Sequence, residues 1–309
     1  MEILHLPDLT PTEAPAACVA ALGFFDGVHR AHRAVLAAAS AAARHLSLPL
    51  LVFTFRSDDG PKGTAPRLTD DAERAALFAE IGASLAVFSD FSAIAATSPE
   101  EFISSMLTFR LGATLAVAGA DFRFGYRAAG DVLSLRRLME AEGGKAHIVP
   151  SIQRGGAPIS STRIRAALAA GDCEEATLLL GRPYTLTLPV LRGASLGATL
   201  GFPTANQCPP PSRMIPASGV YRTTVTLPSG ETLDGVTDVG TRPTVGGTET
   251  RIETHIVDYT GDLYGQRLQV AFHARLRGEM TFPSLDALRA QIEKDSQEVR
   301  TWRTQNGHS

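Results

Sequence analysis

Two histidines near the N-terminus have the chemistry and the spacing to bind a phosphate group. His29 and His32 follow an apolar run that ends in a glycine-containing turn, and a helical pattern covers roughly residues 31–46. A strand that turns into a helix here would place both imidazoles at the helix N-terminus, where unpaired backbone N–H groups and the positive end of the helix dipole gather. The sequence therefore predicts a nucleotide phosphate site, to which three residues of the turn also belong: Gly23, Asp26 and Gly27.

A second run supplies hydroxyl and guanidinium groups at another expected helix start, over residues 162–170. Arginine can bind phosphate oxygens through two parallel hydrogen bonds, which lysine cannot do. We expect this run to complete the phosphate site with five residues: Ser160, Ser161, Thr162, Arg163 and Arg165.

A third group of side chains is expected at the same edge of the predicted sheet. Asp121, Phe122 and Arg123 follow a strand expected over residues 114–118. Ligands of parallel sheets bind beyond the carboxyl ends of the strands, and His29 is also expected there. We therefore assign these three residues to the same site.

A different pair of polar residues lies past the midpoint of the chain. Thr204 and Asn206 offer a hydroxyl and an amide oxygen, which are hard ligands suited to Mg²⁺ beside ATP. The sequence contains no Walker A pattern, so a P-loop kinase is excluded. Glycines can instead let backbone amides approach phosphates, and three are spaced ahead of the pair: Gly193, Gly197 and Gly201.

Glu253 is the candidate general base. It lies in a strand expected over residues 251–257, where alternation puts Arg251, Glu253 and His255 on one face. A neutral hydroxyl is a poor nucleophile, so phosphoryl transfer to it is helped by a carboxylate that accepts its proton. The alternative interpretation is an exposed strand glutamate without a catalytic role.

The order of the expected elements divides these residues between two domains. Short apolar strands alternate with helices up to the turn at residues 181–183, which predicts an α/β fold with a doubly wound parallel sheet. Capping-box patterns at Asp70 and Ser98 mark the starts of two of these helices, and the second is expected to end at Gly112. Residues 184–277 are rich in Thr, Val and Gly without a helical pattern, which favours an antiparallel sheet or barrel. An amphipathic helix capped by Ser284 ends the chain. We place the domains at residues 1–183 and 184–309.

Charge, cysteine content and the N-terminal sequence limit the kinds of binding partner and the cellular location that we expect. A net charge of −3 over 309 residues argues against nucleic acid as the main partner. The N-terminus lacks the basic and apolar regions of a leader, and no apolar run is long enough to cross a membrane. Cys18, Cys173 and Cys208 show no metal-like spacing and are expected as inert thiols. We expect a cytoplasmic protein that is a monomer or a small homo-oligomer.

Taken together, the motifs resemble those of the bacterial bifunctional riboflavin kinase/FMN adenylyltransferase family, whose first module belongs to the HxGH nucleotidyltransferase superfamily. The matching segments are residues 23–32, 119–125, 130–131, 160–165, 203–206, 240–244, 252–255, 262–265 and 277–282. The resemblance implies phosphorylation of riboflavin to FMN and adenylylation of FMN to FAD, with ATP as co-substrate and Mg²⁺ as the metal. It also implies a kinase module built as a six-stranded antiparallel barrel with a C-terminal helix.

The resemblance further implies roles for individual residues. Glu253 would be the base of the kinase step, while Thr204 and Asn206 would contact Mg–ATP. His29 and His32 would be the catalytic residues of adenylyl transfer. Four residues would contact the flavin: Asp121, Phe122, Arg123 and Arg277.

Several positions depart from the family pattern. Ala31 stands where HxGH has glycine, Phe24 stands where asparagine is frequent, and residues 56–59 replace a common Asp-Pro-His-Pro sequence. In the second half, Pro189 lies near a position that is commonly glycine, and Ala198 replaces a frequent arginine. Two alternatives therefore stay open, a riboflavin kinase with a weak or inactive adenylyltransferase module and a non-enzymatic flavin-binding regulator.

Overall fold

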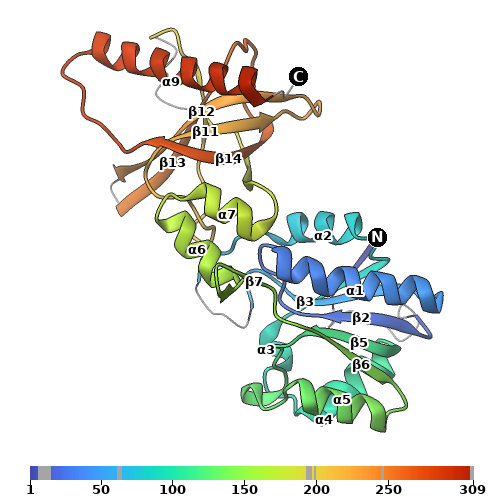
Figure 1. The fold of residues 1–309 in the computed structure, drawn as a ribbon. Helices are drawn as coiled ribbons and strands as arrows, with labels where there is room; N and C mark the ends of the chain where they lie inside the picture. Colours follow the sequence, from blue (N-terminus) through green and yellow to red (C-terminus); the bar gives the residue numbers. More distant parts are fainter. Residues whose placement is uncertain (6–14, 61–64, 193–196, 198–199, 245–246, 307–309) are drawn as a thin grey trace. The chain divides into compact units, whose positions relative to one another are not determined.

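The computed structural model describes residues 1–5, 15–60, 65–192, 197, 200–244 and 247–306 (Figure 1). The chain divides into two compact units, Met1–Ser161 and Thr162–Ser309. The modules expected from the sequence meet instead at residue 183. Residues 162–183 are thus part of the compact second unit, and their functional assignment to the first module stays a prediction.

A parallel sheet forms the centre of the first unit. Its strands are β1 (Glu2–His5), β2 (Cys18–Leu22), β3 (Leu50–Phe55), β4 (Leu85–Ser89), β5 (Ala113–Gly119) and β6 (Lys145–Val149). They lie in the order β1-β4-β3-β2-β5-β6, and each neighbouring pair is parallel. The chain moves outward from β2 on one side and resumes at β5 on the other, which confirms the doubly wound sheet that the sequence predicts.

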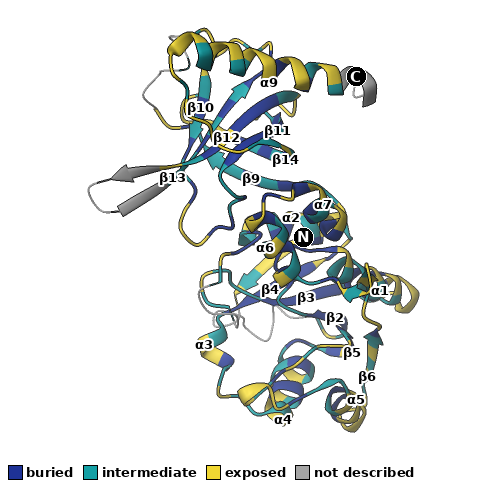
Figure 2. Ribbon diagram, turned by 60° about the vertical axis from the view of Figure 1, so that its left-hand side comes forward, coloured by how far each residue is buried: buried dark blue, intermediate teal, exposed yellow. Residues whose placement is uncertain are grey.

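Helices cover both faces of this sheet. They are α1 (Arg30–Leu46), α2 (Asp71–Glu80), α3 (Phe91–Ile94), α4 (Pro99–Glu101), η2 (Phe102–Arg110), η3 (Tyr126–Ala128) and α5 (Val132–Ala141), and a small hairpin, β7 (Gln153–Arg154) with β8 (Ala157–Pro158), follows. Val19 of β2 packs into the core layer formed with α1 and α2, whereas Ala20 packs into the layer formed with η2 and α5. Burial on both faces explains why strands β2, β3 and β4 are apolar without alternation (Figure 2).

The expected helix over residues 98–112 differs from the structure in its type. Ser98 and Glu101 form the predicted capping box, but from Phe102 the backbone is a π-helix. The hydroxyl of Thr108 donates to the carbonyl oxygens of Ile103 at 3.0 Å and Ser104 at 2.7 Å. Such hydroxyl bonds compete with the regular backbone ladder, and no pattern of apolar residues announces them.

An antiparallel barrel forms most of the second unit. Its strands are β9 (Tyr184–Pro189), β10 (Thr204–Gln207), β11 (Gly219–Thr226), β12 (Thr232–Thr244), β13 (Gly247–Ile256) and β14 (Arg267–Arg277), in the order β10-β13-β12-β11-β14-β9. A bridge between Leu191 and Asn206 joins the two edges, with Leu191 N donating to Asn206 O at 2.7 Å. The predicted six-stranded antiparallel barrel is confirmed.

Three helices accompany the barrel. α6 (Ser161–Ala169) and α7 (Cys173–Leu180) precede it, and α9 (Leu285–Asn306) follows it. α7 packs against β14 and β9, while Val299 of α9 joins a small apolar cluster with Val220 and Val236 on the outer face of the barrel. The predicted cap of α9 is present, because the Ser284 hydroxyl accepts from Ala287 N at 3.2 Å.

The described helices and cysteines bear on two expectations from composition. Within the described ranges, none of the helices has both the length and the apolar character needed to cross a bilayer. Cys18 and Cys173 are buried, and burial raises the pKa of each thiol to about 12. These two thiols are therefore protonated and unreactive at neutral pH.

A chain of hydroxyl groups fixes the inner face of the barrel. Thr223, Thr237 and Thr254 come from three successive strands and are all fully buried. The Thr237 hydroxyl lies 2.7 Å from that of Thr223 and 2.9 Å from that of Thr254. Buried hydroxyls need such partners, so the chain helps to hold the register of β11, β12 and β13.

We expect Thr237→Val to lower the free energy of unfolding of the second unit by about 1–3 kcal/mol, because two buried hydroxyls lose a partner. Calorimetry of the full-length protein measures the change. Thr226→Val is the matched control, because Thr226 makes a comparable bond to Thr232 on the exposed part of the same hairpin. An equal loss in both variants would contradict the role of burial.

Candidate active sites

The turn that leads into α1 has a strained backbone. Phe25 and Val28 adopt φ values of 53° and 39°, and Gly27 between them has φ 84°. Left-handed conformations of non-glycine residues persist only where the surrounding structure enforces them. Phe25 and Val28 are both buried, so core packing holds the turn in this shape.

The two histidines lie together at the start of α1, as the sequence predicts. His29 is the N-cap, and its Nδ1 accepts a hydrogen bond from His32 N at 3.3 Å. The two imidazole rings stack with centroids 3.5 Å apart, and the Phe25 ring meets His32 edge-on at 5.3 Å. His29 is only 3% exposed, so the pair is rigid before any ligand arrives.

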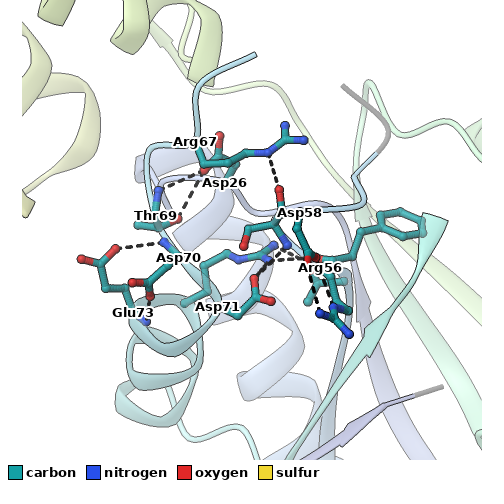
Figure 3. Close-up of polar contacts among 12 residues, drawn as sticks. Asp26, Arg56, Asp58, Arg67, Thr69, Asp70, Asp71 and Glu73 are labelled. Atoms are coloured by element: carbon teal, nitrogen blue, oxygen red, sulfur yellow. Dashed lines mark hydrogen bonds and ion pairs between the residues drawn. The ribbon is translucent and has the colours of Figure 1, made fainter. Parts of the chain in front are cut away.

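The side chain of Asp26 is buried and supports the turn through hydrogen bonds rather than facing solvent. It is 1% exposed, and its Oδ1 accepts from Leu68 N at 2.9 Å and from Thr69 N at 3.1 Å. The hydroxyl of Thr69, which lies beside Asp26 (Figure 3), accepts a hydrogen bond from Gly27 N at 2.8 Å. In this arrangement Asp26 positions the histidine turn, and the ATP contact expected for it stays a prediction.

The segment that departs from the family pattern after β3 forms a network of its own (Figure 3). Arg56 pairs with Asp58 at 2.9 Å and with Asp90 at 3.5 Å, and its hydrogen bond lowers the pKa of the Asp58 carboxyl. The ring of Phe24 lies between two guanidinium groups, 5.0 Å from Arg67 and 5.2 Å from Arg74. Within the replaced segment Arg56 and Asp58 therefore bind each other, while Phe24 contacts Arg67 and Arg74.

The remaining residues assigned to this site are divided between the two units. Asp121 and Arg123 are exposed just after β5, next to β2, and Phe122 stacks on Phe124 at 5.7 Å. The Ser161 hydroxyl donates to Asp26 O at 3.0 Å, which ties the end of the first unit to the histidine turn. Gly23 faces the Phe25 ring, and Ser160 is half-buried beside Ser161.

Thr162, Arg163 and Arg165 belong to the second unit. Thr162 is exposed at the start of α6, and Arg163 and Arg165 are half-buried along it. Arg163 Nη2 lies 3.0 Å from Glu175 Oε1 of α7. Their assignment to the phosphate site of the first unit stays a prediction.

The second candidate site is assembled by strand register. Asn206 of β10 lies directly opposite Glu253 of β13, and Glu253 lies opposite Asp238 of β12. Thr204 lies opposite His255 in the same way. Side chains directly opposite on antiparallel strands share a face, so these residues form one polar patch on the outer face of the barrel.

A cavity of about 620 Å³ lies over this patch, between the barrel and α9. Thr204, Glu253 and His255 line it, as alternation along the expected strand predicts, whereas Arg251 does not. Burial lowers the pKa of His255, whose Nδ1 donates to Pro203 O at 3.1 Å, so its imidazole is neutral at neutral pH. The cavity is large enough for a small aromatic ligand.

A second cavity of about 290 Å³ adjoins the first. Thr204 lines both, and the smaller cavity is otherwise mainly apolar and aromatic, with Tyr259 and Tyr264 in its wall. Two ligands in the two cavities would therefore meet at Thr204. That is the arrangement a group transfer requires.

Thr204 and Asn206 are suited to a hard cation. The Asn206 amide nitrogen donates to Thr204 O at 3.1 Å, which directs the amide oxygen away from the Thr204 carbonyl. Hydroxyl and amide oxygens are ligands that Mg²⁺ accepts, and the carboxylate of Glu253 lies on the neighbouring strand. Among the described residues no group of three or more His, Cys, Asp or Glu side chains could hold a metal ion.

The glycine segment before Thr204 is described only in part. Gly193 lies outside the described residues, as does Ala198. A Cβ on Gly197 would lie 2.4 Å from Phe202 O, and Gly201 has φ 89°, so both positions require glycine. Gly197 lines the larger cavity.

Arg277 lines the larger cavity, and its guanidinium group is paired with the carboxylate of Asp295. Its guanidinium donates to Asp295 of α9 at 2.9 and 3.1 Å, and Asp295 is 3% exposed. A buried pair of this kind fixes α9 over the cavity. The flavin contact expected for Arg277 stays a prediction, with its charge already balanced by Asp295.

Asp238 was not singled out from the sequence, yet it faces Glu253 in the cavity. Desolvation raises the pKa of Asp238 to about 6, and the carboxylates of Glu279 and Glu253 act in the same direction. The signal in the sequence was one of two acids, Asp234 and Asp238, within a strand rich in Val, Thr and Gly. Its meaning depends on the register of β12 against β13, which no local pattern reveals.

Comparison with known proteins identifies a family model for each half of the chain. A family model described as FAD synthetase matches residues 12–163, and one described as riboflavin kinase matches residues 180–303. A curated protein from Escherichia coli K12, named bifunctional riboflavin kinase/FMN adenylyltransferase, is 37% identical, with 92% of each chain covered. A protein of the same name from Bacillus subtilis is 32% identical and covers 97% of each chain. The chain belongs to the bifunctional riboflavin kinase/FMN adenylyltransferase family.

One solved structure has a fold similar to that of nearly the whole chain. It is described as a macrolide-efflux protein from Streptococcus pneumoniae, and it matches with a TM-score of 0.88 and 30% identity over 98% of this chain and all of its own. The likeness confirms a two-unit fold of this kind. The efflux description applies to that protein alone.

Asp238 makes stability depend on pH. Its pKa lies at about 6 in the folded protein against an ordinary value of 3.8, so the folded state binds the proton more tightly. Stability therefore falls as the pH rises from 4 through 6. We expect Asp238→Asn to raise the free energy of unfolding of the second unit at pH 7.5 by less than about 1 kcal/mol, because Asp238 is exposed and solvent screens its charge.

The gain from Asp238→Asn should vanish at pH 4, where the wild-type carboxyl is largely protonated in the folded state. Calorimetry at several pH values measures it. Glu231→Gln, in the exposed turn between β11 and β12, is the control for the loss of one negative charge. A gain that is independent of pH would contradict this account.

Proposed function

We propose that this protein phosphorylates riboflavin in the cavity of the second unit and adenylylates the resulting FMN at the histidine turn of the first. The observation that carries the proposal is the position of Glu253, opposite Asn206 and inside the 620 Å³ cavity. A carboxylate beside a cation-binding pair is what phosphoryl transfer to a neutral hydroxyl needs.

In the kinase step the flavin occupies the larger cavity and the nucleoside of ATP the smaller one. The terminal ribityl hydroxyl attacks the γ-phosphorus of ATP, the bond from that phosphorus to the bridging oxygen breaks, and ADP leaves. Glu253 accepts the hydroxyl proton. Thr204, which lines both cavities, lies where the two substrates meet.

We further propose that Thr204 and Asn206 hold the Mg²⁺ that accompanies ATP. When bound, the ion supplies positive charge to the phosphate oxygens. The polypeptide's own contribution is to fix these two oxygen ligands beside Glu253, through the β10–β13 register. Mg²⁺ keeps several water ligands in such sites, so two protein ligands suffice.

The adenylyl step has different needs. The FMN phosphate is already an anion, so it attacks the α-phosphorus of ATP without a strong base, and pyrophosphate leaves as the bond to the β-phosphate oxygen breaks. The site has to hold two anions in line and stabilise the charge that moves onto pyrophosphate. His29 and His32 at the start of α1 are placed for that task, with Asp26 holding the turn.

One assay tests the proposal against its alternatives. Purified protein is incubated with riboflavin, ATP and Mg²⁺, and the flavins are separated by chromatography. FAD supports the bifunctional enzyme, FMN alone supports a kinase with an inactive first module, and unchanged riboflavin supports a non-enzymatic flavin binder. We also propose a cytoplasmic location, in line with the two buried thiols, and a monomer or small homo-oligomer that does not bind nucleic acid.

We expect Glu253→Gln to slow FMN formation by about 10²–10⁴-fold, because the hydroxyl loses its proton acceptor. Conversion of supplied FMN to FAD should continue at the wild-type rate, which shows that the protein is folded. Glu231→Gln is the matched control. Full-rate FMN formation by the Glu253→Gln variant would refute the role of the base.

The reciprocal variant is His29→Asn, since asparagine keeps an acceptor for the helix cap but removes the imidazole. We expect the conversion of FMN to FAD to fall by about 10²-fold or more, with riboflavin phosphorylation unchanged. His45→Ala, in the last turn of the same helix, is the control. If FAD formation survived intact, the histidine turn would not be the adenylyl-transfer site.

A further inference from the structure

The larger cavity is rich in acid. Asp238, Glu253, Glu279 and Asp295 line it, against the single basic side chain of Arg277 among the described lining residues. Asp295 already neutralises that guanidinium at 2.9 Å. Such a surface favours a neutral ligand and repels a triphosphate.

The smaller cavity suits a nucleoside, but its described lining brings no positive charge and includes one acid, Asp262. Its described lining includes neither lysine nor arginine. A triphosphate that extends from this cavity toward Thr204 would therefore need a cation on the rim, besides any bound metal. Among its described residues, the second unit offers Arg192.

Arg192 lies at the rim of the smaller cavity. Its guanidinium carbon lies 4.9 Å from the centroid of the Tyr264 ring, and Tyr264 lines the smaller cavity. Arg192 is exposed, so its N–H donors can reach a ligand.

The backbone around Arg192 is anchored on both sides of the site. The preceding residue, Leu191, donates its N–H to Asn206 O at 2.7 Å, and Val190 N donates to Gln266 O at 2.9 Å. Gly265 N donates back to Val190 O at 2.9 Å. These bonds fix the start of the Arg192 side chain between the proposed cation ligand and the loop that carries Tyr264.

We propose that Arg192 binds the triphosphate of the ATP used to phosphorylate riboflavin, with the Tyr264 ring orienting its guanidinium. The inference rests on the proposed kinase function of the second unit. Stacking on the ring leaves the edge of the guanidinium plane free to form two parallel hydrogen bonds with phosphate oxygens.

The test is steady-state kinetics of riboflavin phosphorylation by full-length Arg192→Gln. The KM for ATP should rise about tenfold or more, as expected for the loss of a charge-assisted hydrogen bond, while the KM for riboflavin stays unchanged. Arg192→Lys should recover part of the loss, because it keeps the charge without the bidentate geometry. Arg267→Gln, an exposed arginine of the same unit whose Nη2 donates to Thr187 O, should behave as wild type.

Inhibition by ADP and AMP separates a phosphate contact from a contact with the base. ADP should inhibit Arg192→Gln about tenfold less than wild type, whereas AMP, which lacks the outer phosphates, should change little. Equal weakening of both inhibitors, or an unchanged KM for ATP, would overturn the inference. FMN adenylylation, which uses a separate ATP site, should be unaffected and reports on folding. Failure of the wild-type enzyme to make FMN would instead overturn the proposed function, and this inference with it.

Discussion

The register between β10, β13 and β12 is the constraint on which the second site depends. It places Asn206, Glu253 and Asp238 side by side across three strands. Side chains alternate along a strand, so a slip of one residue would exchange Glu253 for Thr254, which is fully buried in the barrel. The buried hydroxyl chain through Thr237 and Thr254 opposes such a slip, because it pairs only in the observed register. Packing on the inner face thus decides which side chains reach the cavity on the outer face.

The first unit positions its histidines by a different means. There the turn between β2 and α1 is forced into an unfavourable backbone shape by the burial of Phe25 and Val28. The carboxylate of Asp26 then secures the turn through the backbone N–H groups of residues 68 and 69. Buried charge-assisted bonds of this kind are strong. The imidazoles gain a fixed geometry, and the core absorbs the strain of the turn.

The sequence predicted what depends on local patterns, and it failed where distant residues meet. Continuous apolar strands and the capping boxes at Asp70 and Ser98 predicted the doubly wound unit, and both boxes are present. The exposed four-residue strand β1 had no such signal. The ion pair between Arg277 and Asp295 joins the end of β14 to α9, so no local pattern in the sequence indicated it. Asp238 shows the same limit, since its environment is set by strands whose pairing had to be known first.

The distribution of charge follows from the chemistry that each substrate brings. A ribityl hydroxyl is neutral and has to lose a proton, so carboxylates near it help, and the cavity under α9 supplies four. The same carboxylates would repel a triphosphate, and Coulomb repulsion weakens only slowly with distance in a partly buried site. The nucleotide therefore has to approach from the side of the smaller cavity, whose described wall is mainly apolar and aromatic and includes a single acid, Asp262. Thr204 lies at the boundary between the larger and the smaller cavity. There the neutral hydroxyl acceptor and the charged phosphate donor can meet, while each substrate stays in its own cavity.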